Sequence, residues 1–431
     1  MTQEWNRRTF IGTLAAAGAT VATSAMQISR QDGPVVVDMA PDGPVLKAGL
    51  IGCGGRGRGA AVNFIDAGPN LQIVALADVF QDRLDEARKL IKAERGQEVP
   101  ESRCFVGFDG YQKLIDSGVD IVINATPPHF RPQHFAAAVA AKKHVFLEKP
   151  LAVDPVGVRS VLETNEKAKA LGLCVGTGTQ MRHDRARIEA RKRVLDGAIG
   201  DILSARAFRN QGALWYKPRE AGWSDMEAMI RDWVNWTWLS GDHIVEQHIH
   251  HLDQMLWFLG EPPAKALGMG ARARRVTGDQ YDFFSIDYAY NNGVHMHSTI
   301  RQLNGCGNTR AETLVGTRGS CETEGIIYDP KGKVVWKYEG PKSNPIVQEH
   351  SDLVRAIRTG KPYNTARETA ISTLMAIMGR ESAYTGKEIT WKGIMESDLR
   401  LGPTAYAMGP VAIKAEAPVP GVGGPELYKS E

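Results

Sequence analysis

The residues best suited to chemistry lie in two short segments. Lys149 stands in the run Glu148-Lys149-Pro150, and residues 241–253 carry Glu246 and His250 four positions apart. An imidazole can take the proton from an alcohol, and a cationic amine can stabilise the oxygen as it becomes a carbonyl. We therefore expect alcohol oxidation, with His250 as base, Lys149 as its electrostatic partner, and Glu246 orienting the imidazole or holding a second hydroxyl.

The segment with His250 is predicted to be helical. Asp242 can cap a helix that runs to Leu259 and stops at Gly260. Because side chains three or four apart share a helix face, we expect a common face at positions 246, 250, 253 and 257.

The histidines of this segment allow two other interpretations. A metal could be held by Glu246 with His243, His248, His250 and His251. The order differs from HExxH, and positions 248 and 250 point to different helix faces, so we expect no metal site. Packed or solvated histidines are the other interpretation, which fits His251 and His248 better than His250.

A glycine-rich run follows the first buried-strand pattern, at residues 45–51. It reads Gly52-Cys53-Gly54-Gly55-Arg56-Gly57 and leads into a helical pattern that continues through Ile65. A strand, this run and a helix are typical of a dinucleotide site. Gly52 would permit the tight turn, Gly54 the approach of a pyrophosphate, and Gly57 close helix–strand packing. Gly55 and Arg56 complete the loop at the helix N-terminus, which favours an anion.

Asp78 ends the next strand pattern, 21 residues after Gly57. A carboxylate there accepts a hydrogen bond from the adenosine ribose and repels a 2′-phosphate, so we expect NAD rather than NADP. Arg56 and Arg58 could soften that preference, which leaves NADP open.

Strand and helix patterns alternate through the first half of the chain. Strands are predicted at 45–51, 71–77, 119–125, 144–147 and 173–176, and helices at 81–94, 132–141 and 154–170. This alternation predicts a doubly wound parallel sheet. Ligands bind at the carboxyl ends of such strands, where Thr126, Pro127, Glu148 and Lys149 follow two of them.

The second half reads as strands with few helices between them. Strand patterns occur at 202–209, 283–290, 294–300, 312–316 and 334–338, with a hairpin turn at Asn291-Asn292-Gly293. We expect an open, largely antiparallel sheet whose broad face also pairs subunits into a homo-oligomer, a dimer or tetramer.

Aromatic residues gather just before this sheet. Six of the nine tryptophans fall between positions 215 and 257, and Trp236 and Trp257 fit core packing. Trp215, Tyr216 and Trp233 are candidates for stacking on a sugar ring. Arg182, at the domain junction, would bond substrate hydroxyls or tie the domains together, and His243 is a further candidate for substrate binding.

Composition excludes several classes of protein. The 431 residues are 43% hydrophobic and 23% charged, with 52 Lys and Arg against 49 Asp and Glu, so neither disorder nor nucleic-acid binding is indicated. Five scattered cysteines exclude a disulfide scaffold. After the first thirty residues no apolar run is long enough for a stable membrane span.

The N-terminus predicts export. Arg7-Arg8 precedes a mildly apolar stretch to about Met26, which resembles a bacterial twin-arginine signal. We therefore expect a periplasmic or extracytoplasmic protein. The predicted division is a signal at 1–30, a linker at 31–44, a Rossmann domain at 45–178, a C-terminal α/β domain at 179–400, and a Pro/Gly-rich tail at 401–431 that wraps over a surface or stays mobile.

Together the 52–57 loop, Asp78, Thr126-Pro127 and the run Lys143–Pro150 resemble the Gfo/Idh/MocA oxidoreductase family over residues 45–390. The resemblance implies a Rossmann domain, an open-sheet domain, and NAD(P)-dependent oxidation of a sugar or cyclitol hydroxyl. Family members usually carry Asp-x-Gly-x-His-x-x-Asp where this chain has Glu246, His248, His250 and Asp253. The loop after Thr126-Pro127 also departs from the family, reading Pro128-His129-Phe130-Arg131.

Export constrains the chemistry, because free NAD is scarce outside the cytoplasm. We expect a cofactor that is bound before export and recycled in one site. The family offers sugar–sugar oxidoreduction, or glycoside hydrolysis through a transient keto-sugar. A non-catalytic sugar- or nucleotide-binding protein is the third alternative.

Overall fold

The computed structural model describes residues 39–422. The predicted twin-arginine segment at 1–30, most of the linker and residues 423–431 lie outside this range. No helix in the described range is long and apolar enough to cross a membrane.

A six-stranded parallel sheet forms the first layer, in the order β3-β2-β1-β4-β5-β6. Its strands are β1 (Leu46–Ile51), β2 (Leu71–Asp78), β3 (Cys104–Val106), β4 (Ile121–Asn124), β5 (His144–Leu147) and β6 (Val175–Thr177). The predicted doubly wound sheet is confirmed. Strand β3, three residues long, was not predicted, because so short a run has no readable period.

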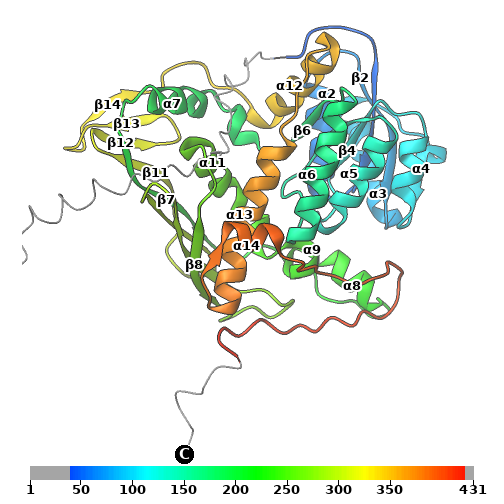
Figure 1. The fold of residues 1–431 in the computed structure, drawn as a ribbon. Coiled ribbons are helices and arrows are strands. Elements are labelled where there is room, and N and C mark those ends of the chain that lie inside the picture. Colours follow the sequence, from blue (N-terminus) through cyan, green and yellow to red (C-terminus); the bar gives the residue numbers. More distant parts are fainter. Residues whose placement is uncertain (1–38, 423–431) are drawn as a thin grey trace, which may run out of the picture. The chain divides into compact units, whose positions relative to one another are not determined.

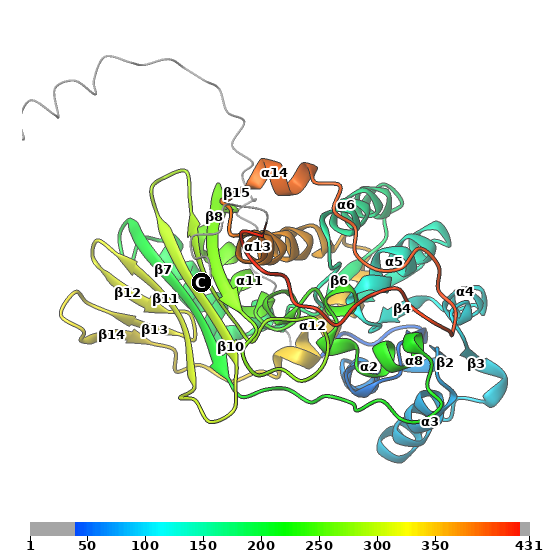
Figure 2. The same cartoon turned by 90° about the horizontal axis from the view of Figure 1, so that it is seen from below.

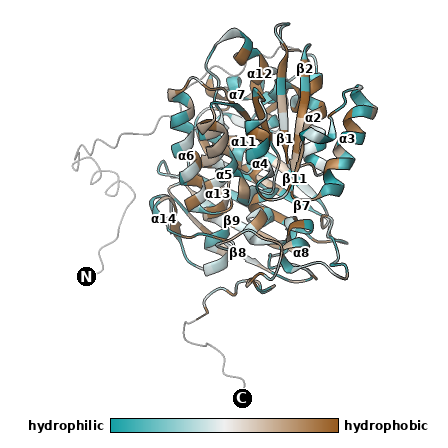
Figure 3. Cartoon of the chain, turned by 90° about the vertical axis from the view of Figure 1, so that its right-hand side faces the viewer, coloured by the Kyte–Doolittle hydropathy of each residue, from teal (hydrophilic) through white to brown (hydrophobic). Residues whose placement is uncertain are grey.

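Helices cover this sheet: α2 (Gly55–Asp66), α3 (Gln81–Arg95), α4 (Gly110–Asp116), α5 (Arg131–Ala140) and α6 (Pro155–Ala170). Asp154 caps α6 by accepting a hydrogen bond from the Gly157 amide at 2.7 Å, with Pro155 in the first turn. Figure 3 shows the apolar β1 and β2 among more polar helix surfaces, as on α3.

A nine-stranded sheet forms the second layer, in the order β14-β13-β12-β11-β7-β10-β9-β8-β15 (Figure 1). Its strands are β7 (Ile202–Gln211), β8 (Lys265–Ala271), β9 (Phe283–Ala289), β10 (His295–Gln302), β11 (Thr309–Gly316), β12 (Gly319–Glu322), β13 (Ile326–Tyr328), β14 (Val334–Lys337) and β15 (Ile389–Thr390). Only β7 and β10 pair in parallel, which confirms the largely antiparallel sheet, and the predicted hairpin at 291–293 joins β9 to β10.

Four further helices precede or follow strands of the second sheet: α7 (Arg185–Leu195), α8 (Asp225–Arg231), α9 (Thr237–Ser240) and α14 (Trp391–Glu396). The helix predicted from Asp242 to Leu259 is two helices, α10 (His243–Glu246) and α11 (Ile249–Leu259). The buried His248 ring bonds Ser298 Oγ at 2.7 Å and anchors the break between them. The predicted common face of positions 246, 250, 253 and 257 was therefore wrong for Glu246.

The chain then returns to the first layer. Helices α12 (Pro345–Thr359) and α13 (Ala366–Thr385) link the two sheets, and Leu353 and Val354 of α12 share a core cluster with Leu50 and Phe146. Val175 of β6 also pairs with Asn364. The predicted boundary at 178 separates the two sheets, but the nucleotide-binding layer is completed by residues far beyond it.

The C-terminal segment 401–418, here called the strap, lies along both layers. Figure 2 shows it running from α14 past α5 to α8. Its amides at Leu401 and Val411 bond Asp154 and Asp225, and Tyr281 donates to the Pro418 carbonyl at 2.9 Å. These contacts place residues 401–418 of the predicted tail against the surface of both layers.

Candidate functional site

A cavity of about 560 Å³ opens at the carboxyl ends of the parallel strands. One wall comes from the first layer and contains Thr126, Pro127, Asp78 and the glycine loop. The opposite wall comes from the second half of the chain and contains Trp215, Tyr216, Lys217, Trp233, Glu246 and Gln247. The residues predicted for cofactor binding, except Glu148 and Lys149, thus line the same cavity as all three aromatic residues predicted for substrate binding.

The glycine loop fits a dinucleotide. Gly52 has φ +89°, and a Cβ there would lie 2.6 Å from the Thr126 amide nitrogen. A Cβ on Gly57 would overlap the Gly52 carbonyl oxygen, so helix and strand could not approach as they do. In front of Gly55 there is open space, and Gly54 starts α2 without a side-chain cap. The first turn of α2 therefore offers free N–H groups to a pyrophosphate.

Asp78 lines the cavity where the adenosine ribose is expected. Its Oδ2 accepts from the Cys53 amide at 2.7 Å and its Oδ1 from the Phe80 amide at 3.0 Å. Burial raises the pKa of Asp78, and these two N–H groups oppose the rise. Arg58 and Arg83 line the same wall, and Arg58 pairs with Glu86.

Arg56 and Glu148 form an ion pair beneath the loop. Arg56 Nε lies 2.5 Å from Glu148 Oε1, and a second carboxylate, Glu349, lies 3.6 Å from Nη2. Burial and the charge of Glu148 raise the pKa of Glu349 well above its usual value. Glu148 is buried behind the cavity, so it supports the loop rather than contacting the cofactor directly.

Lys149 lies two residues after the end of β5 and contacts Glu246, the last residue of α10. Its Nζ lies 2.6 Å from the Glu246 carbonyl oxygen and 3.0 Å from Oε1. Burial would raise the pKa of Glu246, but Lys149 and hydrogen bonds bring it below its usual value. The buried Arg131 braces the Lys149 loop by donating to the Pro150 carbonyl at 2.6 Å, a support the sequence analysis missed.

His250 is half-buried on the first turn of α11. Burial, followed by the charges of Lys149 and Arg209, lowers the pKa of His250 well below its usual value. The ring is therefore neutral and able to accept a proton. Glu246 is bound to Lys149, so the predicted orientation of the imidazole by Glu246 is not what the structure shows.

Arg182 and His243 lie outside the cavity lining. Arg182 forms a two-pronged ion pair with Asp253, with both N–O distances 2.8 Å. His243 is buried, and its Nδ1 bonds Asp242 at 2.7 Å. These contacts favour a role for Arg182 in holding the structure together rather than in binding substrate. They place His243 in the core rather than in the substrate site. In the described range no cluster of three or more His, Cys, Asp or Glu side chains is arranged to hold a metal.

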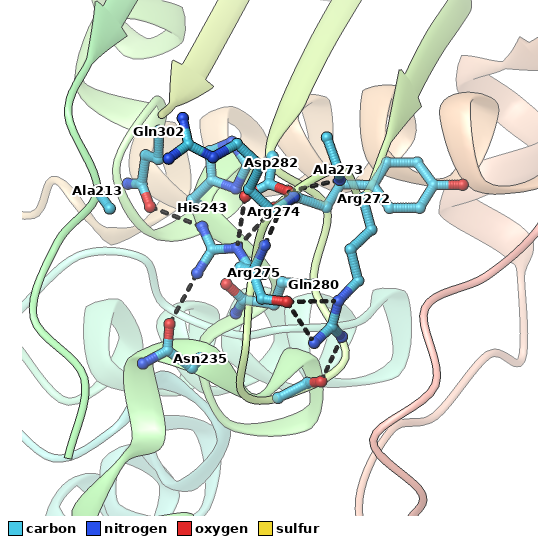
Figure 4. Close-up of polar contacts among 12 residues, drawn as sticks. Ala213, Asn235, His243, Arg272, Ala273, Arg274, Arg275, Gln280, Asp282 and Gln302 are labelled. Carbon is cyan, nitrogen blue, oxygen red and sulfur yellow. Dashed lines mark hydrogen bonds and ion pairs between the residues drawn. The ribbon is translucent and has the colours of Figure 1, made fainter. Parts of the chain in front are cut away.

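The aromatic wall is held by the loop between β8 and β9. Arg275 of this loop donates to Asn235 at 2.7 Å and to Gln302 at 2.8 Å, and Asp282 Oδ2 accepts from the amides of Ala273 and Arg274 (Figure 4). Asn235 in turn donates to the Trp215 carbonyl. Trp215 and Trp233 thus sit on a hydrogen-bonded frame.

Tyr406 of the strap is a cavity residue that the sequence analysis missed. Its hydroxyl lies 2.7 Å from His129 Nε2 in a hydrogen bond, and its ring packs on Phe108 and Phe130. A tyrosine in a Pro/Gly-rich tail has no periodic signal that would reveal this position. The strap therefore closes one side of the cavity.

Comparisons with known proteins agree with this architecture. Residues 46–177 match the model of the Gfo/Idh/MocA oxidoreductase family with an NAD-binding Rossmann fold, and residues 188–322 match its C-terminal domain. Scyllo-inositol 2-dehydrogenase (NAD(+)) of Bacillus subtilis is 24% identical over 281 residues, covering 64% of this chain and 72% of the relative. A glycosyl hydrolase family 109 protein of Shewanella pealeana is 25% identical over 213 residues, covering 47% and 45%.

Among solved structures, the aldose–aldose oxidoreductase of Caulobacter crescentus, complexed with glycerol, has a TM-score of 0.64. It is 19% identical, and the match covers 80% of this chain and 99% of that one. This likeness concerns the fold. With both family models matched in order along the chain, the protein belongs to the Gfo/Idh/MocA family and is an NAD-binding oxidoreductase.

Proposed function

We propose that the protein oxidises a secondary hydroxyl of a sugar, sugar derivative or cyclitol, with an NAD that stays bound and is recycled in one site. The observation that carries this proposal is the buried Lys149–Glu246 ion pair, whose Glu246 lines the same cavity as the glycine loop and Asp78. His250 lies on the next helix, and the charge of Lys149 contributes to the lowering of its pKa.

The side chains divide the work. The neutral His250 accepts the proton of the substrate hydroxyl, and the Lys149 ammonium stabilises negative charge on that oxygen. Bound NAD supplies the acceptor for the hydride. Trp215, Tyr216 and Trp233 offer ring faces to the apolar side of a sugar.

Retention of the nucleotide is supported by what covers the cavity. Arg231 of α8 crosses to the first layer, pairs with Asp82 at 3.0 Å and lies over the Phe80 ring. Tyr406 adds the strap on the same side. Such covering suits the expected twin-arginine export to the periplasm, where a lost nucleotide could not be replaced. We also propose a homo-oligomer that pairs through the outer face of the second sheet.

Glycoside hydrolysis through a transient keto-sugar is the second candidate, favoured by the relative named as a family 109 glycosyl hydrolase. It needs the same oxidation first, followed by loss of the glycosidic substituent. A protein that only binds sugar or nucleotide is the third candidate.

One experiment separates these functions. Purified protein, with no nucleotide added, is denatured to measure released NAD, and a native sample is scanned near 340 nm with sugars and glycosides. We expect bound NAD and a reduced-nicotinamide band with one sugar class. Release of an aglycone would favour hydrolysis. NAD present without any band would favour mere binding, and absence of NAD would overturn the resident cofactor.

A further inference from the structure

Arg209 is a half-buried cation without a carboxylate in contact. It lies on β7 on the same face as the buried Ala205 and Ala207. Its Nε donates to Gln211 Oε1 and its Nη2 to Gln247 Oε1, both at 3.1 Å, and its Nη1 donates to the Gln247 carbonyl oxygen at 3.5 Å. Among the described residues no carboxylate oxygen lies within 4.0 Å of its guanidinium. Because a guanidinium carries more N–H groups than these bonds use, donors remain free on it.

The nearest acids are already committed to other cations. Glu246 is bound to Lys149 at 3.0 Å, and Glu312 is bound to Arg187. Both carboxylates attract Arg209 only at longer range, and burial lowers its pKa. Arg209 is therefore a desolvated charge that the fold itself does not neutralise.

A second arginine stands directly opposite. In the antiparallel pairing of β7 with β11, Arg310 is the cross-strand partner of Arg209. Like charges in this position are destabilising. The sole acid paired with Arg310 among the described residues is Glu324, at 3.5 Å. Glu324 is exposed and also forms an ion pair with Arg187, at 3.1 Å. The four cations of this group exceed its three carboxylates by one: Arg209, Arg310, Arg187 and Lys149 against Glu246, Glu312 and Glu324.

Gln247 links Arg209 to the cavity and to the segment that carries the candidate base. His250 of α11 experiences the charges of both Arg209 and Arg310. Gln247, which accepts from Arg209, also lines the cavity. Neither arginine lines the cavity itself, and Arg310 is exposed, but Arg209 lies behind Gln247, on the side of Glu246 rather than at the glycine loop.

We propose that Arg209 and Arg310 bind one anionic group of the substrate, so the substrate is an acidic sugar whose carboxylate lies between them. The inference rests on the proposed function, because it concerns the hydroxyl-bearing substrate of that same site. A planar carboxylate matches the guanidinium fork, and a single unmatched charge suits a monoanion better than a dianionic phosphate ester.

The test compares matched pairs on the purified NAD-containing protein: glucose with glucuronate, galactose with galacturonate, and glucose with glucose 6-phosphate. Calorimetric titration measures binding independently of turnover. We expect the uronates to bind at least about tenfold more tightly than their neutral partners, the effect of one charge-assisted hydrogen bond. The 6-phosphate is expected to bind less tightly than glucuronate.

Two variants locate the effect. Arg209→Gln should abolish the preference for uronates, and Arg209→Lys should restore part of it. Arg206→Gln is the matched control, since Arg206 is exposed on the opposite face of the same strand. Circular dichroism and released NAD check that each variant is folded.

Uronates that bind no better than the neutral sugars, including the case where neither binds, overturn the inference. A preference that survives Arg209→Gln also overturns it. Tighter binding of glucose 6-phosphate than of glucuronate would overturn the carboxylate as the bound group and indicate a phosphate instead. The proposed function is judged separately, by the reduced-nicotinamide band, and it stands if a neutral sugar produces that band.

Discussion

Lys149 and Glu246 join the two layers of the protein through a buried ion pair. The Lys149 ammonium lies 2.6 Å from the Glu246 carbonyl oxygen and 3.0 Å from its Oε1. Lys149 follows a strand of the first sheet, whereas Glu246 ends a helix that belongs to the second half of the chain. The contact therefore fixes a charge at the meeting of the cofactor side and the substrate side.

Substituting Lys149→Met should lower kcat by about 100- to 1000-fold, because no cation then stabilises the developing oxygen charge. The amount of NAD released on denaturation should stay at the wild-type level. Lys167→Met, on the surface of α6, is the control. Wild-type turnover in Lys149→Met would remove this residue from the mechanism.

Substituting His250→Asn should lower kcat by about 100-fold or more, since the base is lost. In the wild-type enzyme, the lowered pKa of His250 keeps the ring neutral at pH 6.5 and above. The acid limb of kcat/KM should therefore lie well below pH 6.5, and activity should be level through neutral pH. A limb at or above pH 6.5 would contradict this role for His250.

Substituting Asp78→Asn should narrow the preference for NAD over NADP, because the carboxylate that repels a 2′-phosphate is removed while Arg58 and Arg83 remain. Nucleotide-free protein is titrated with each cofactor by fluorescence. We expect the ratio of the two Kd values to move by about tenfold toward NADP. Asp116→Asn, on the exposed side of α4, should leave the ratio unchanged.

Substituting Tyr406→Ala should speed release of the bound nucleotide, since the strap loses its ring contacts and its hydrogen bond to His129. Loss of NAD during dialysis measures the rate. Tyr406→Phe keeps the ring and should change the rate by only about tenfold or less, the effect of one hydrogen bond. Equal rates for all three proteins would show that the strap does not retain the cofactor.

Substituting Arg182→Met should destabilise the fold by about 3–5 kcal/mol, because the buried Asp253 loses its cationic partner and keeps only the hydrogen bond from Ser372. Denaturant unfolding measures the change. The KM for sugar in the remaining folded enzyme should stay as in the wild type. A raised KM with unchanged stability would instead restore Arg182 to the substrate site.

The nucleotide-binding elements could be predicted because their signals are local. The 52–57 loop lies between a strand and a helix in the sequence itself, and Asp78 and Lys149 each follow an apolar strand. Their convergence at one edge then follows from the geometry of any parallel sheet.

The remaining parts of the site depend on contacts between distant residues. The helical period continues through Gln247 and His248, and only the bond to Ser298, on a strand 50 residues later, reveals the break. From the sequence alone, Arg182 fits a substrate ligand and a link between the domains equally well. Only its contact with Asp253, 71 positions later, favours the structural role. Tyr406 reaches the cavity through the path of the strap, which no pattern within the tail encodes.

Because α12 returns to the first layer, the parts of the nucleotide site are completed in a fixed order during translation. Leu353, Val354 and the Val175–Asn364 pairing complete a layer that begins at Leu46, and Tyr406 closes the cavity later still. A ribosome that has made only the six parallel strands has not yet made these residues. A nucleotide in this site can therefore be fully covered only after nearly the whole chain has emerged from the ribosome.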